Sequence, residues 1–566
     1  MAPFGWTILI ILFAFFISTQ PHSSKAIQTT TTAADLILHN GFIWTVDEAK
    51  PRAEAIAIRG DKIVKVGGDA ETLALKGERT QVTDLKGAFV VPGFNDNHVH
   101  FSSAANFFWN IPLMDVHADD AFVARVREYV AAHPGEPVRG GGWGAYEDWG
   151  MGASASGGKR QSWTPDRNLI DAITGGTPMF INKFDDSLYF ANTAALGRAG
   201  LDDSSDDTEN ISHVRDGKRR ITGAMRIKNA RGIEARFLGG ELKPDRAKRL
   251  KMTENALRLV REAGVTSFQD MSDHEQLQLY NELLDQGRLT ARINFRYGLE
   301  HWEHMKSLGL GRGSGNAMIR LGAVKGHIDG IMGTSGARFY EAYSNDPTKM
   351  NRGHWRPLTW VSPERRTELN RGPFTEMMIR ADAAGIQVSV HAIGDEANGL
   401  MLDMIEAMNK VNGPRDRRFR LVHAQVLAPR DFDRLKGLGI VAEVQPFHLS
   451  DDMRWMEERI GHERCKGAYA FKTIQRKGAT LSFGSDWPGT TASIYPINPI
   501  HGLYAAVTRQ TVQRTPADGW FPDERLTIED AIRAYTWGST YSSFEEQIKG
   551  TLTEGKLADI AVLDTN

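Results

Sequence analysis

The chain has 566 residues, of which 41% are hydrophobic and 24% charged, a composition typical of a folded globular protein with several domains or one large barrel. Its 68 basic and 70 acidic residues give a formal net charge of −2, so the composition has no sign of a nucleic-acid or anionic-membrane partner. The single cysteine, Cys465, excludes intramolecular disulfides and cysteine-rich metal sites.

The chain begins with an apolar segment. Residues 6–17, WTILIILFAFFI, form a continuous run of signal-peptide length that is too short for a typical membrane-spanning helix. Ser24-Lys25-Ala26 follows with the small residues of a cleavage site. We predict that residues 1–26 are a signal peptide that directs the protein into the secretory pathway, to the endoplasmic reticulum or to secretion. An uncleaved anchor on an endomembrane is the alternative. The sequon Asn210-Ile211-Ser212 agrees with this route and predicts a glycoprotein.

Both ends of the remaining chain have the pattern of short strands. Residues 35–93 contain β-type runs separated by turn signals such as Asn40-Gly41 and Gly67-Gly68. Residues 546–566 repeat this pattern of short strands and glycine turns.

Between these ends, amphipathic helices alternate with short apolar runs. A helix predicted over 246–264 precedes VTSFQD, and a helix predicted over 374–385 precedes IQVSVHAIGD. Repeated helix-then-strand units are typical of a parallel sheet covered by helices. The sequence therefore predicts an α/β fold, a (β/α)₈ TIM-type barrel over residues 94–545, with an insertion near residues 140–240.

Two histidines, His98 and His100, follow the apolar run GAFVVPG at the first of these strands. Side chains at positions i and i+2 of a strand point to the same side, so both imidazoles can reach one point. Two neutral imidazoles at one point suit a divalent metal ion. Hydrogen bonding to neighbouring groups is the alternative for this pair taken alone.

Four further polar residues stand at the ends of predicted strands. They are Lys325 in IRLGAVKGHIDG, His391 in IQVSVHAIGD, His423 in FRLVHAQ and Asp486 in ATLSFGSDWP. Each could instead cap a helix or bond a loop. In a barrel, however, reactive residues gather at the carboxyl ends of the strands, so we expect the set to lie together.

These motifs resemble the amidohydrolase superfamily, in particular the amidohydrolase-3 branch that contains YtcJ-like proteins and N-substituted formamide deformylases. VVPGFNDNHVHF is similar to its first metal motif, and VKGHIDGIMGTSGA to its lysine segment. HAIGD and VHAQ resemble its later histidine segments, and GSDWP its aspartate segment. GTLTEGKLADIAVLD resembles the strand that returns the chain to the N-terminal β-sandwich. The resemblance implies a small composite sandwich built from residues 35–93 and 546–566.

The resemblance also implies a ligand set for two divalent metal ions. One ion is held by His98, His100 and Asp486, the second by His391 and His423, and Lys325 bridges the two. Because a lysine ammonium is a cation, the bridge is implied to be a carbamate formed from Lys325 and carbon dioxide. Zinc is the metal expected from imidazole and carboxylate ligands, and other transition metals such as manganese, iron or nickel are compatible with them.

The reaction implied by the resemblance is hydrolysis of a non-peptide C–N bond in an amide, N-formyl or cyclic amide. A hydroxide bridging the metals attacks the carbonyl carbon, since metal binding lowers the pKa of water to about 7 near zinc. Asp486 takes its proton and delivers it to the leaving nitrogen. The partner is thus a small-molecule amide, and the resemblance is compatible with a homodimer.

Four residues are candidates for substrate contacts. Trp143 and Tyr146 lie in GGGWGAYEDW, His448 ends a predicted strand, and Asp329 follows Lys325 by four residues. His448 could equally be a packed histidine, and Asp329 could orient the site through hydrogen bonds.

Two other functions stand beside the leading hypothesis. A signalling or scaffold protein with this fold could lack turnover, but such relatives typically lose ligands, and here all six positions are filled. A mononuclear deaminase fits less well, because Lys325 would have no evident purpose.

Overall fold

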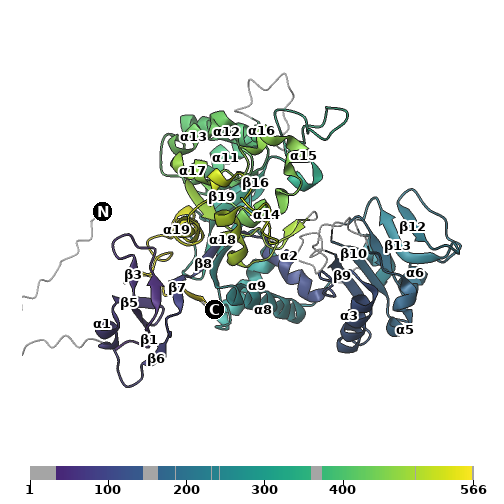
Figure 1. The fold of residues 1–566 in the computed structure, drawn as a ribbon, viewed down its shortest axis with the longest axis horizontal. Coiled ribbons are helices and arrows are strands. Elements are labelled where there is room, and N and C mark those ends of the chain that lie inside the picture. Colours follow the sequence, from purple (N-terminus) through teal and green to yellow (C-terminus); the bar gives the residue numbers. More distant parts are fainter. Residues whose placement is uncertain are drawn as a thin grey trace, which may run out of the picture.

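The computed structural model describes residues 33–144, 163–184, 186–230, 232–240, 243–357, 372–490 and 493–563. The predicted signal segment, residues 1–26, lies outside the described residues. Within the described ranges, no helix combines the length and the apolar character that crossing a bilayer requires. Figure 1 shows a central body with a small β domain on one side and a lobe on the other.

The central body is built on eight parallel strands. In the sheet they follow the order β20-β19-β18-β17-β16-β15-β14-β8. In chain order they are β8 (Phe94–Val99), β14 (Val265–Asp270), β15 (Arg292–Gly298), β16 (Ile319–His327), β17 (Gln387–Ala392), β18 (Phe419–His423), β19 (Ile440–Val444) and β20 (Thr480–Phe483). The two outermost strands of this order meet through the main chain, where the Asp486 N–H donates to the His98 carbonyl (2.8 Å) and the His100 N–H to the Trp487 carbonyl (2.7 Å). The predicted (β/α)₈ TIM-type fold is confirmed.

Helices and buried strands follow the pattern read from the sequence. Strands β17 and β18 are buried at every position, as expected for a parallel sheet covered by helices. The helices that accompany the strands are α2 (Phe101–Asn106), α8 (Arg246–Glu262), α9 (His274–Asp285), α10 (Trp302–Ser307), α11 (Pro373–Ala383), α12 (Asp395–Asn412), α13 (Phe432–Gly437), α14 (Pro446–Asp452), α15 (Met456–Ile460), α16 (His462–Cys465), α17 (Phe471–Arg476), α18 (Pro499–Thr508), α19 (Ile528–Arg533) and α20 (Ser539–Ser542). Helix α8 begins at an Asp245 cap, whose side chain accepts from the Lys248 N–H (2.8 Å).

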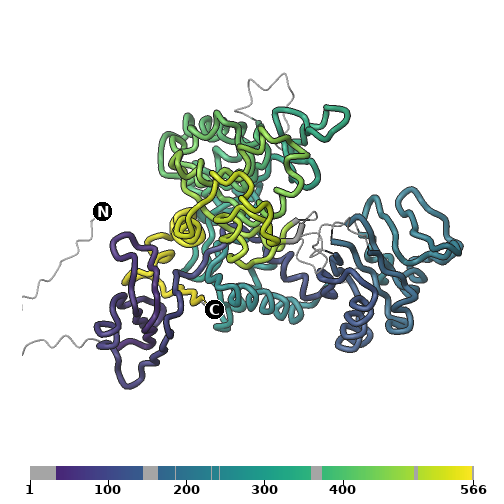
Figure 2. The backbone as a smooth tube through the Cα atoms, viewed as in Figure 1, coloured from purple at the N-terminus to yellow at the C-terminus, as the bar shows by residue number. Residues whose placement is uncertain are grey.

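The small β domain contains strands from both ends of the chain. Its two sheets have the orders β5-β4-β1-β6 and β23-β7-β2-β3. The strands are β1 (Leu36–His39), β2 (Phe42–Trp44), β3 (Arg52–Ala53), β4 (Ala55–Arg59), β5 (Lys62–Gly67), β6 (Gln81–Asp84), β7 (Phe89–Pro92) and β23 (Ile560–Leu563), with α1 (Asp69–Leu73). Strand β23 pairs antiparallel with β7, in register Val562↔Val90. Figure 2 shows the yellow C-terminal segment lying against the purple N-terminal strands.

The lobe on the other side is the insertion. Its five-stranded sheet has the order β12-β13-β11-β10-β9 and its own apolar clusters. The elements are α3 (Asp119–Ala132), β9 (Val138–Trp143), α5 (Asp171–Thr174), β10 (Met179–Lys183), β11 (Tyr189–Ala191), α6 (Thr193–Arg198), β12 (Ile211–Arg215), β13 (Ile221–Ile227) and α7 (Ile233–Leu238). Helix α3 packs into the core of this lobe through Phe122 and Val126, so the lobe begins earlier than residue 140. The sequon Asn210-Ile211-Ser212 lies at the start of β12, and its glycosylation stays a prediction.

Candidate metal centre

Six residues singled out in the sequence line one cavity of about 540 Å³ at the carboxyl ends of the barrel strands. They are His98, His100, Lys325, His391, His423 and Asp486. Five of them are buried, and only His100 is partly exposed. Each lies at or just beyond a strand end because the parallel strands all run toward this edge of the sheet.

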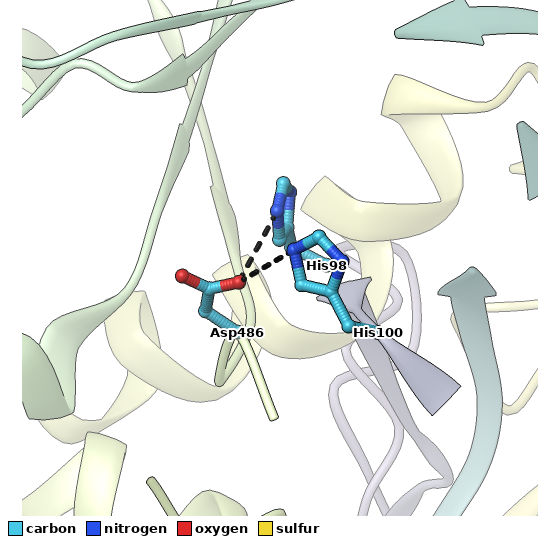
Figure 3. Close-up of side chains that lie close together, drawn as sticks. All are labelled: His98, His100 and Asp486. Carbon is cyan, nitrogen blue, oxygen red and sulfur yellow. Dashed lines mark ion pairs between the residues drawn. The ribbon is translucent and has the colours of Figure 1, made fainter. Parts of the chain in front are cut away.

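Two of these histidines, His98 and His100, converge on one carboxylate oxygen of Asp486. Figure 3 shows His98 and His100 pointing at Asp486. Both imidazole Nε2 atoms lie 3.3 Å from Asp486 Oδ1. Asp96 joins the two segments that carry these residues, because its Oδ1 accepts hydrogen bonds from the main-chain N–H groups of Ser485 (3.0 Å) and His98 (3.1 Å). The two predicted histidines and the predicted aspartate are therefore brought together.

A second group of three shares the same carboxylate. His423, His448 and Asp486 each offer a ligand atom, and these atoms lie within 4.8 Å of one another. His448 Nε2 is 3.9 Å from Asp486 Oδ2. His448 thus joins the metal ligand candidates, whereas the sequence predicted a substrate contact or a packed histidine.

His391 lies next to this second group rather than within it. Its ring centroid is 4.6 Å from that of His423. Its Nε2 is 3.2 Å from Asp329 Oδ1. Asp329 also accepts the N–H groups of Gly394 (3.0 Å) and Arg338 (2.9 Å), so it fixes the loop beside His391. It is not among the residues that line the cavity.

Burial sets the protonation of these groups. Desolvation lowers the pKa of His98 and His423 well below the usual value, so both imidazoles are neutral and able to donate a lone pair. Burial alone would raise the pKa of Asp486, but the adjacent His100 and the other histidines outweigh it, and the pKa is lowered. Burial lowers the pKa of Lys325 to about 7.

The donor set fits divalent metal ions. Neutral imidazoles and an ionised carboxylate are the ligands that zinc and similar metals bind. Asp486 Oδ1 and His448 Nε2 are buried and receive no hydrogen bond from the described part of the chain. Buried polar atoms are normally satisfied, and a bound metal ion would satisfy both of these atoms.

A carboxylate outside the predicted set orients His98. Glu443, on β19, is fully buried, and its Oε1 is 3.1 Å from His98 Nδ1. The same carboxylate pairs with Arg296 (2.9 Å) and Arg420 (2.7 Å), both also buried. The signal in the sequence is a charged residue inside the apolar run IVAEV, which is unusual for a strand buried on both faces.

Gln445 orients His423 in the same way that Glu443 orients His98. Its Oε1 is 2.7 Å from His423 Nδ1, so that nitrogen carries the proton and Nε2 is left as the acceptor. The sequence has no strong signal for this residue, because a glutamine beyond a strand end commonly belongs to a loop.

Two predicted substrate contacts have different outcomes. Trp143 packs in the core of the insertion and is 1% exposed, and it does not line the cavity. The neighbouring Gly141 and Gly142 line the cavity instead, because β9 turns the bulky indole toward the apolar core of the lobe. Tyr146 lies outside the described residues.

Comparisons with known proteins identify the family of this chain. A model of the amidohydrolase family matches residues 81–566. Protein LONG AFTER FAR-RED 3 of Arabidopsis thaliana is 33% identical over 549 residues, which cover 94% of this chain and 88% of that protein. N-substituted formamide deformylase of Arthrobacter pascens is 24% identical, with 94% of each chain covered. A solved structure of an uncharacterized metal-dependent hydrolase from Pyrococcus furiosus matches with a TM-score of 0.69 and 26% identity, over 94% of this chain and 99% of that one. The resemblance seen in the sequence is confirmed, and the chain belongs to the amidohydrolase family.

Proposed function

We propose that this protein is a metal-dependent amidohydrolase that cleaves a non-peptide C–N bond of a small amide, N-formyl or cyclic amide compound. The observation that carries the proposal is the convergence of histidine side chains on the buried carboxylate of Asp486 inside one cavity. The similarity to a relative named N-substituted formamide deformylase supports the N-formyl class in particular.

The described residues offer two places for metal ions. His98, His100 and Asp486 would hold one, and His423 would hold the other together with its neighbours His448 and His391. When bound, such ions supply a water of lowered pKa and polarise a carbonyl oxygen. Glu443 and Gln445 keep one nitrogen of His98 and His423 occupied, so that the other faces the metal.

Lys325 would complete the centre as a carbamate. Its Nζ is 3.4 Å from His98 Nε2, and a substantial fraction of the amine is neutral near pH 7 because burial lowers its pKa to about 7. A neutral amine can attack the carbon of carbon dioxide, form an N–C bond and release one proton. The product is an anion that metal ions can share, whereas an ammonium would repel them.

Asp486 would move the proton in the reaction. Its carboxylate is ionised in the resting site because the surrounding histidines lower its pKa. An ionised carboxylate can accept a proton from the attacking water and then donate it to the nitrogen that leaves. His100 is partly exposed, and its Nε2 lies 3.3 Å from Asp486 Oδ1.

The direct test is metal analysis of the purified protein together with a screen of N-acyl and N-formyl amines. We expect bound divalent metal and hydrolysis of at least one of these classes. Lys325→Arg should lose both metal and activity, since a guanidinium stays cationic and cannot be carboxylated. Lys325→Ala should behave in the same way, but short carboxylic acids with added metal should restore part of both. Full metal content and turnover in Lys325→Arg would refute the carbamate.

A further inference from the structure

The cavity continues beyond the metal ligands to a second polar position. Asp452 and Gln425 line it there and are only 4% and 3% exposed. Asp452 is the last residue of α14, the helix that also carries His448. Neither Asp452 nor Gln425 has a part in the reaction proposed above.

The helix sets the distance between this position and the metal centre. His448 and Asp452 are four residues apart in α14 and lie on one face of the helix. With a rise of about 1.5 Å per residue, Asp452 lies roughly 6 Å farther along the helix axis than His448. A substrate whose amide reaches the metal ligands could therefore reach Asp452 with its remaining chain.

The carboxylate of Asp452 has one oxygen engaged and one left over. Its Oδ2 accepts from Tyr469 Oη (2.6 Å) and from Gln425 Nε2. Within the described ranges, Oδ1 receives no hydrogen bond, and it belongs to a side chain that lines the cavity. A carboxylate oxygen that is free in this way can accept from a donor on a ligand that enters the cavity.

The surroundings favour a cationic donor. Trp455 and Tyr495 line the cavity together with Asp452. One face of each ring is occupied, by Arg459 on Trp455 (4.3 Å) and by His448 on Tyr495 (3.9 Å), so an ammonium group would contact the other face or the ring edge. Arg459, whose charge acts on Asp452, donates to the main-chain carbonyls of Met332 and Gly333. Burial raises the pKa of Asp452 to about 7, so an ammonium group beside it would favour the ionised form.

We propose that Asp452 is a specificity-determining residue that binds an ammonium group of the substrate. The substrate is then an amide or formamide whose chain carries a primary amine a few carbons from the bond that is cleaved. This inference rests on the proposed amidohydrolase function and assigns the class of its substrate.

The test compares two matched series of compounds. Mono-N-formyl diaminoalkanes with three to five carbons carry the ammonium group, and N-formylalkylamines of equal length end in a methyl group. We expect the wild-type protein to favour the amino series in kcat/KM by about tenfold or more. Asp452→Asn, which keeps an oxygen for Tyr469, should bring the ratio to within about threefold of one and leave kcat/KM for the methyl series nearly unchanged.

A matched control separates recognition from general damage. Asp431→Asn alters another buried carboxylate, which pairs with Arg434 and lies outside the cavity lining. It should keep the wild-type preference. Equal kcat/KM for the two series in the wild-type protein would overturn the inference even if Asp452→Asn did not fold.

Binding measurements keep this inference distinct from the proposed function. If the wild-type protein hydrolyses neither series, the proposed function fails for formamides, and recognition is then measured by calorimetry with the metal-loaded protein. Mono-N-formyl-1,4-diaminobutane should bind at least about tenfold tighter than N-formylpentylamine, and Asp452→Asn should remove this difference. Equal binding of the two compounds would overturn the inference.

Discussion

Two residues of the metal centre have backbones in the left-handed region. The φ angles are 73° for His423 and 59° for Asp486. Residues other than glycine adopt this region rarely, because the Cβ approaches the neighbouring carbonyl oxygen. Hydrogen bonds hold both residues in place. The Asp486 main-chain N–H donates to the His98 carbonyl, and the His423 Nδ1–H donates to Gln445 Oε1. Such conformations cluster at functional sites, where the direction of a side chain matters more than local stability.

The roles of Asp486 and His423 can be separated by substitution. Asp486→Asn removes the charge and the proton acceptor but keeps the shape, so we expect metal to remain largely bound while kcat falls by about 10²–10⁴. His423→Ala removes a ligand and should lower metal content and activity together. Metal per chain and kcat, measured on the amide found in the screen, check both. Near-normal turnover in Asp486→Asn would exclude its part in proton transfer.

Asp452 also predicts a pH dependence of stability. Its pKa is about 7 in the folded chain and about 3.9 in the unfolded chain. Between these values the folded state binds more protons, so this carboxyl stabilises the fold below about pH 4, and the contribution is lost as pH rises to about 7.

Asp452→Asn should therefore flatten the pH profile. Between pH 5 and pH 8, we expect the wild-type protein to lose about 3 kcal/mol more of its free energy of unfolding than the variant does. Urea unfolding of metal-free protein at both pH values measures the difference, and other titrating groups are common to the two proteins. Parallel profiles would show that Asp452 has an ordinary pKa.

At the scale of an element, β19 carries a carboxylate, Glu443, that neutralises two buried arginines in the barrel interior. Glu443 lies between the fully buried guanidinium groups of Arg296 and Arg420 and also contacts His98. Burying these charges is favourable only while they remain paired, and removing one partner leaves the others uncompensated. The strand thereby links the stability of the barrel to the orientation of a metal ligand.

Replacing the Glu443 carboxylate should strongly destabilise the fold. Glu443→Gln keeps the shape but leaves two buried guanidinium groups without a counter-charge, so we expect a loss of about 3–5 kcal/mol in the free energy of unfolding and lower metal content. Urea unfolding and metal analysis measure both. Glu376→Gln, which breaks the exposed i,i+4 pair with Arg380, is the control and should change stability by less than about 0.5 kcal/mol. A similarly small change in Glu443→Gln would contradict the account of β19.

The elements predicted from sequence are those with strong local patterns. Apolar runs fixed the strand ends, so the positions of His98, His391 and Asp486 at one edge of the barrel could be predicted. His448 could not be assigned to the metal centre, because it sits in a short helix after β19 whose direction depends on tertiary packing. The role of Glu443 could not be predicted for a similar reason, because its partners come from other strands that are distant in the sequence.

At the scale of the whole molecule, the insertion contributes to the barrel's cavity. Gly141 and Asn182, from the lobe, line the same space as the metal ligands of the barrel. Loops and lobes at this edge vary more readily than strands. The cavity is thus lined both by the barrel, which carries the candidate metal ligands and Asp452, and by the insertion.

The apolar N-terminal segment predicts where the protein is located in the cell. We propose that the protein enters the secretory pathway and that the mature form begins near Ile27, since an apolar run precedes a small-residue cleavage motif. Mass measurement of protein from its native cells gives the N-terminus. A soluble cytosolic protein with Met1 intact would refute this prediction.

The pairing of β23 with β7 has a consequence for biosynthesis. Strand β7 is synthesised long before its partner, because all the barrel strands lie between β7 and β23 in the chain. Until then one edge of its sheet stays open, with main-chain donors and acceptors available to other nascent chains. Completion of the sandwich therefore has to wait until the barrel has been synthesised, and a chain that terminates before Ile560 would keep an aggregation-prone edge even with all its barrel strands made.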